Sequence, residues 1–160
     1  MSQVSKHLEW CFKDKNRLTT SKIDIDLARK HLSKSEYNFN ILQTLEELKI
    51  YDWALNVGFY SIYHCFLAIL AKYGYESKNQ SCTISVLLNL IDENKLNFER
   101  DLISQFDSLD NEKDLINPSI RESREVSTYG VRTSVDLNQL ERIKELVVKI
   151  QRETVRVLHE

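Results

Sequence analysis

The pattern of apolar and polar positions singles out residues 54–74. This segment is apolar on nearly every helical face, carries several aromatic residues and is interrupted mainly by Asn56, Ser61 and His64. A surface helix shows one apolar stripe and one polar face, so the segment is predicted to be a central helix with neighbours on several sides. It is too short and too interrupted for a membrane span of about 20 apolar residues. We therefore expect no association with a membrane.

Helical spacing continues on both sides of the central segment. Apolar or semi-apolar positions recur at intervals of three and four over residues 24–48, and a break near residues 49–52 makes this helix and the central one an expected antiparallel hairpin. Gly74 suits a left-handed cap at the end of the central helix. Residues 75–81 are expected to form a loop.

The remaining helices are shorter, except for the last. Ser119 to Glu122 has the spacing of a capping box, which would open a helix that ends at Gly130, and Asp136 offers a second such start. The segment after Asp136 has the cleanest amphipathic stripe in the chain. Further helices are expected over residues 4–18, 83–90 and 98–106.

Composition supports a helical protein. One proline and three glycines leave few places for the sharp turns of an all-β fold, and 160 residues suit a single core. The prediction is an all-α protein: one up-and-down antiparallel bundle of four to five main helices plus a short N-terminal helix. Residues 1–23 would be an N-terminal helical extension, and residues 24–160 the bundle.

The cysteines Cys11, Cys65 and Cys82 are odd in number and widely spaced, with no Cys-x-x-Cys pair. The first residues lack the apolar run of a signal peptide. These features predict reduced thiols in a cytoplasmic protein, with Cys65 in the core.

Metal and cofactor sites are not expected. The histidines, His7, His31, His64 and His159, are scattered, and no cluster of His, Cys and Asp has the spacing of metal ligands. The three glycines are isolated, which excludes the phosphate loop and the dinucleotide fingerprint.

The charge pattern gives no strong general attraction to polyanions. The chain carries 22 Lys and Arg against 24 Asp and Glu, with a basic excess in residues 1–35 and an acidic excess in residues 36–112. Any contact with phosphate must therefore come from a local patch.

The best local patch surrounds Tyr129. Arg121 and Arg124 lie three residues apart on one helical face, and Arg132 can fold back toward them. Guanidinium groups pair with phosphate, and tyrosine can stack on a base. Lys78 could add a positive charge. The alternative is a pair of solvated arginines with Glu122 and Glu125 as partners, worth little energy.

Three stretches resemble one family. Phe59-Tyr-Ser-Ile-Tyr-His-Cys-Phe66, Gly74 to Gln80, and Arg124-Glu-Val-Ser-Thr-Tyr-Gly130 resemble, in that order, segments of HEPN domains (higher-eukaryote and prokaryote nucleotide-binding). The likeness is to the small free-standing HEPN proteins of archaea and bacteria and covers residues 24–159. It puts Tyr60, Tyr63 and His64 in the family core.

The resemblance implies a helical bundle that dimerises. Some members are RNA-cutting toxins paired with a nucleotidyltransferase antitoxin, and others are non-catalytic modules that bind nucleotides, RNA or proteins. Catalytic members carry Arg-x(4–6)-His. Here Tyr129 stands after Arg124 where a nuclease needs histidine, and Gln80 replaces another histidine. The literal match, Arg152 to His159, lies at the chain end, where a helix is expected to fray.

These observations leave three hypotheses. The leading one is a non-catalytic HEPN-like module, a homodimer that binds a nucleotide or RNA phosphate at the patch or a nucleotidyltransferase partner, within a toxin–antitoxin-like system. The first alternative is a metal-independent ribonuclease toxin, and the second is a purely structural oligomerisation domain. His64 is interpreted as a core histidine that bonds to a neighbouring helix, although a neutral imidazole could also be a general base.

Overall fold

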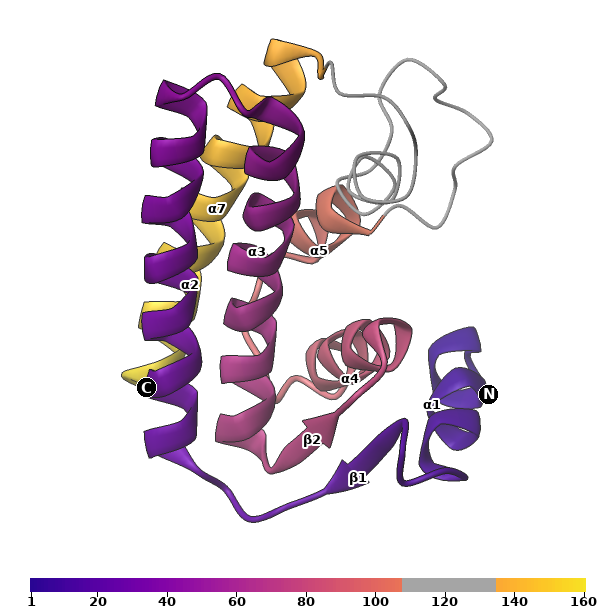
Figure 1. Ribbon diagram of the computed structural model, residues 1–160. Coiled ribbons are helices and arrows are strands. Elements are labelled where there is room, and N and C mark those ends of the chain that lie inside the picture. The colour runs from indigo at the N-terminus through magenta and orange to yellow at the C-terminus, as the bar shows by residue number, and fades with distance from the viewer. Residues whose placement is uncertain (108–134) are drawn as a thin grey trace.

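The computed structural model describes residues 1–107 and 135–160, and these form a helical bundle with one small strand ribbon (Figure 1). The predicted all-α bundle is confirmed, with six helices in the described residues. The helix expected from Ser119 to Gly130 lies outside them.

Three long helices make the main layer. α2 (Ile25–Glu47) and α3 (Tyr51–Tyr73) run antiparallel, and α7 (Leu137–Leu158) packs against both (Figure 1). The turn between α2 and α3 passes through Lys49, whose φ is 61°. The expected hairpin is therefore confirmed.

Local capping explains where these helices begin and end. The Asp24 carboxylate accepts the Leu27 N–H at 2.9 Å, and the Asp136 side chain accepts the Asn138 N–H at 2.9 Å. Gly74 ends α3 with φ 81°, the predicted left-handed cap. The expected helix start at Asp136 is likewise confirmed.

The second layer packs on the far side of α3 from α2. It consists of α4 (Gln80–Asp92) and α5 (Arg100–Phe106). Phe106 of α5 stacks on Phe59 at 4.9 Å between ring centroids and meets Phe66 edge-on at 5.0 Å. All three rings are completely buried. α3 is thus the central helix that its sequence predicts.

Burial also settles the character of α3. It is long and apolar enough to cross a membrane by composition, but 72% of its most apolar window is buried inside the bundle. It is a core helix.

The N-terminal residues differ from the prediction. α1 (Gln3–Phe12) is shorter than expected, and β1 (Leu18–Thr20) pairs antiparallel with β2 (Tyr75–Ser77), where a loop was expected. This ribbon joins segments far apart in the sequence, and three-residue strands carry no periodic signal. It brings α1 against α4 (Figure 1).

The expectation of three reduced cysteines is wrong for two of them. Cys11 of α1 and Cys82 of α4 are joined by a disulfide, with their Cα atoms 5.8 Å apart. Their sequence separation of 71 gives no local signal for the pairing, which depends on the packing of α1 on α4. Cys65 is free and completely buried, as predicted, and burial raises the pKa of its thiol to about 11.

Candidate functional site

The predicted phosphate patch is described only in part. Arg121, Arg124, Tyr129 and Arg132 lie outside the described residues. Lys78 follows β2, with an exposed side chain, and its backbone N–H donates to the Arg17 carbonyl at 3.0 Å. The patch therefore stays a prediction.

The three family-core residues all lie on α3. The Tyr63 hydroxyl bonds to Thr83 Oγ1 on α4 at 3.1 Å, and burial raises its pKa. Tyr60 meets the Phe59 ring edge-on and is 39% exposed, so it reaches the outer surface of the bundle. His64 is half-buried.

His64 forms a pair with His31 of α2. Their Nδ1 atoms are 3.0 Å apart, so one donates and the other accepts. Desolvation, with His31 and Lys34 nearby, lowers the pKa of His64 to about 4, and burial lowers the pKa of His31. Both rings are therefore neutral near pH 7. The predicted bond between His64 and a neighbouring helix is confirmed.

The groups around this pair do not complete a nucleophilic set. The Ser61 hydroxyl donates to the Ser35 carbonyl at 2.8 Å, and the Cys65 sulfur lies 3.2 Å from Ser35 Oγ. Gln151 of α7 donates to the same Ser35 hydroxyl at 3.0 Å. These contacts join α2, α3 and α7 through buried polar groups, and they direct Ser61 and Cys65 toward Ser35. The arrangement suits helix packing better than covalent catalysis.

A groove of about 430 Å³ lies beside the histidine pair, between the start of α2 and the ribbon. Its lining includes His31 and Lys22, but also the carboxylates of Asp24 and Glu76. With one lysine against two acids, this groove does not favour a polyanion.

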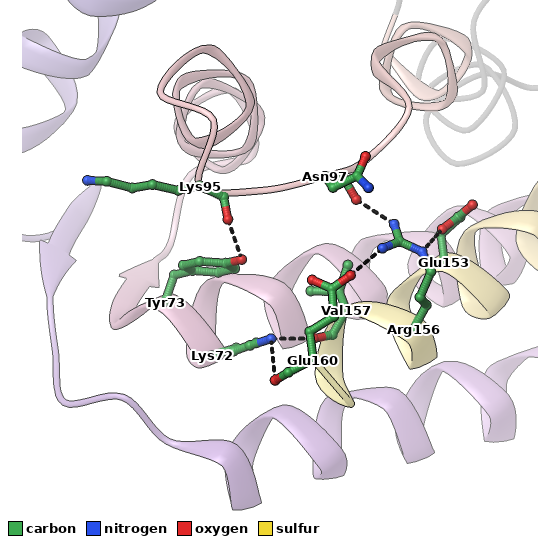
Figure 2. Close-up of polar contacts among 8 residues, drawn as sticks. All are labelled: Lys72, Tyr73, Lys95, Asn97, Glu153, Arg156, Val157 and Glu160. Atoms are coloured by element: carbon green, nitrogen blue, oxygen red, sulfur yellow. Dashed lines mark hydrogen bonds and ion pairs between the residues drawn. The ribbon is translucent and has the colours of Figure 1, made fainter.

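The Arg152–His159 match lies on a helix end that is well anchored, contrary to expectation. Figure 2 shows Lys72 of α3 bonded to the carbonyls of Val157 and Glu160, and Arg156 bonded to Glu153, Glu160 and the Asn97 carbonyl. These side chains bind carbonyls and carboxylates that a free helix end leaves to water.

The surroundings of Arg152 nevertheless do not suit RNA. It lines a groove of about 330 Å³ with Lys149 and with the acidic residues Glu99, Asp101 and Glu153. His159 lies two helical turns further on, about 10.5 Å along the axis. Negative charge around the arginine opposes the approach of a phosphate.

A third cluster lies where α1 packs on α4, at the Cys11–Cys82 disulfide. His7, Cys11 and Cys82 place one ligand atom each within 4.8 Å of one another. His7 and Cys11 are four residues apart on one face of α1, and this spacing was the signal that sequence reasoning missed. The partner from α4 is visible only in the fold.

The comparisons with known proteins agree with the bundle. No curated protein matches the chain. The model of the HEPN domain matches residues 28–156, most of the chain. This match covers α3 with Tyr60, Tyr63 and His64, and most of α7. The chain therefore belongs to the HEPN domain family.

Proposed function

We propose that this HEPN module binds the phosphate groups of a nucleotide or an RNA and does not cleave them. The observation that carries the non-catalytic part of the proposal is the His31–His64 pair, because it engages the central histidine in a contact between two helices. A second support is the sequence after Arg124, where Tyr129 replaces the histidine that a HEPN nuclease needs.

The proposed ligand contacts are Arg121, Arg124 and Arg132, with Lys78 as a further positive charge. Guanidinium groups form paired, charge-assisted bonds to phosphate oxygens. Tyr129 would stack on a base or donate its hydroxyl. Because the contacts are ionic, affinity would fall as salt rises.

The same proposal includes a cytoplasmic homodimer, with a nucleotidyltransferase-type partner in a toxin–antitoxin-like system. The outer side of α3 supports an interface, since Trp53 is 52% exposed and Tyr60 39%. Large aromatic side chains are enriched at protein interfaces. Light scattering of the purified chain would give its mass, and a monomer at high concentration would reject the homodimer.

Calorimetric titration with a mononucleotide and with a short single-stranded RNA tests the ligand. Loss of a bond to a charged group costs about 1.5–3 kcal/mol, so Arg124→Ala should weaken binding at least roughly tenfold. Arg29→Ala is the matched control, because Arg29 is exposed and its ion pair within residues 1–107 and 135–160 is with the exposed Asp26 at 3.8 Å. No binding by the wild type, or equal binding by Arg124→Ala, rejects the proposed site.

The anchored end of α7 is the observation that favours the ribonuclease alternative. It predicts RNA cleavage in the presence of a chelator, lost in His159→Gln. Intact RNA after incubation with the wild type would exclude this activity. A purely structural protein would instead form a stable oligomer and bind neither probe.

A further inference from the structure

His7, Cys11 and Cys82 gather a ring nitrogen and two sulfurs where α1 packs on α4. His7 Nδ1 lies 3.7 Å from Cys11 Sγ, and all three ligand atoms lie within 4.8 Å of one another. Both cysteines are completely buried. His7 and Cys11 precede the segment that matches the HEPN domain, residues 28–156, and Cys82 lies inside it. The proposed function does not use this cluster.

The atom types and spacing fit a zinc ion once the sulfurs are thiolates. Zinc binds cysteine sulfur at about 2.3 Å and histidine nitrogen at about 2.0–2.1 Å in a tetrahedron. Those bond lengths put sulfur and nitrogen about 3.6 Å apart, close to the 3.7 Å between Cys11 and His7. The Cα atoms of the cysteines, 5.8 Å apart, allow both side chains to reach one ion by rotation.

The hydrogen bonds of His7 leave Nδ1 as the atom that a metal would use. Ser85 Oγ lies 2.6 Å from Nδ1, and Ser81 Oγ lies 3.4 Å from Nε2. Ser81 donates its own proton to Asn79 Oδ1 at 2.7 Å, so it can only accept from His7. The proton of the neutral ring therefore lies on Nε2, and the lone pair of Nδ1 accepts the Ser85 hydroxyl proton, a bond that zinc would replace. Metal-binding histidines are held by such bonds through their other nitrogen.

Cys82 lies at the positive end of a helix dipole. It lies in the first turn of α4, and its N–H is bonded to Asn79 Oδ1 at 3.0 Å. The N-terminal end of a helix stabilises negative charge. Nearby, the guanidinium of Arg17 stacks on Trp10 with its Cζ 3.7 Å from the ring centroid, and Trp10 stacks on His7.

We propose that His7, Cys11 and Cys82 form a zinc site that opens when the Cys11–Cys82 disulfide is reduced. A thiol reductant, such as a cellular dithiol, supplies two electrons and two protons and becomes a disulfide itself, while the protein disulfide becomes two thiols. Zn²⁺ then binds both sulfurs and His7 Nδ1 and displaces two protons. A water completes four ligands. In the reverse step an external disulfide accepts two electrons from the two thiolates and takes up two protons to become two thiols. The Cys11–Cys82 bond forms again, and Zn²⁺ is released because its sulfur ligands are lost.

The two states hold α1 on α4 by alternative links. In an oxidising medium the disulfide holds α1 on α4. In a reducing compartment, where disulfides are rare, the bound metal holds the two helices together. The site is thus a redox-sensitive metal centre, independent of the nucleotide proposal.

The test uses the full chain, first oxidised and then treated with a phosphine reductant, with Co²⁺ as the spectroscopic probe. The reduced protein should bind one Co²⁺ in a tetrahedral site with sulfur-to-cobalt charge-transfer absorption, and Zn²⁺ should displace it. The oxidised protein should give no such spectrum. This comparison involves no substitution, so it does not depend on whether a variant folds.

Variants then assign the ligands. Cys82→Ser should abolish the charge-transfer spectrum, and His7→Gln should weaken zinc binding at least roughly tenfold in competition with a coloured chelator. His64→Gln is the control, because His64 lies on α3 and pairs with His31 of α2, not with the cluster, and it should leave the spectrum unchanged. The proposal is overturned if reduced, helical protein binds no Co²⁺, if the oxidised protein binds it equally, or if His7→Gln has no effect.

Discussion

The histidine pair makes the stability of the protein depend on pH, and substitution of His64 should weaken this dependence. His31 and His64 face each other with Nδ1 atoms 3.0 Å apart, and only one proton fits between them. The pKa of His64 is lowered from 6.5 to about 4 by desolvation, by His31 and by Lys34. Because the folded pKa lies below the unfolded one, this group contributes stability above pH 6.5, and the contribution is lost as pH falls toward 4.

The size of the effect follows from that difference. A change of one in pKa corresponds to about 1.4 kcal/mol, so a fall from 6.5 to about 4 corresponds to at most roughly 3.4 kcal/mol. His64 is half-buried, and solvent screens its charge. We therefore expect about 1–2 kcal/mol of the free energy of unfolding to be lost between pH 6.5 and 4 through this residue.

Urea unfolding at several pH values measures the effect. In His64→Gln, the side chain keeps hydrogen-bonding groups but does not titrate, so the free energy of unfolding should fall less steeply with acidification than in the wild type. Carboxylates titrate equally in both proteins and cancel in the comparison. His159→Gln is the matched control, because His159 is exposed at the end of α7. Parallel curves for the wild type and His64→Gln would refute the reasoning.

Three further predictions concern packing and the link between α1 and α4. Gly58→Ala should destabilise the protein by about 1 kcal/mol in urea, because its Cβ would lie 2.9 Å from Ile143 Cγ2; a gain in stability, as at an open helical glycine, would contradict this close packing. Reduction of the Cys11–Cys82 disulfide in chelator should cost about 4 kcal/mol, since it closes a loop with a sequence separation of 71; a loss below about 1 kcal/mol would show that the link constrains little. Phe66→Ala should lower the free energy of unfolding by about 3–5 kcal/mol, because it leaves a cavity beside Phe106 in the core. An unchanged melting temperature would show that Phe66 does not stabilise the core.

The main helices could be predicted because their signals are local. The period of apolar residues, the cap at Asp136 and the left-handed Gly74 all act within one or two turns. The ribbon of β1 and β2 could not, because its hydrogen bonds join residues more than 50 positions apart and its strands are only three residues long. Nothing in a three-residue window distinguishes such a strand from a loop.

The clusters of functional side chains also divide into contacts that have a local sequence signal and contacts that only the packing of the helices creates. His7 and Cys11 share a helical face and could be found from spacing alone, but Cys82 joins them only through the packing of α1 on α4. His31 and His64 are 33 residues apart, and only the folding of the α2–α3 hairpin makes them neighbours. The arginine patch is supported by the spacing of its residues in the sequence and by the family resemblance, because its arginines lie outside the described residues.

The most direct test of the proposed function observes binding and cleavage in one sample. A labelled single-stranded RNA is incubated with the protein in chelator, and portions are run on native and denaturing gels. The account predicts a shifted band on the native gel, full-length RNA on the denaturing gel, and loss of the shift in Arg124→Ala but not in Arg29→Ala. RNA fragments produced by the wild type, or no shift at any protein concentration, would contradict it.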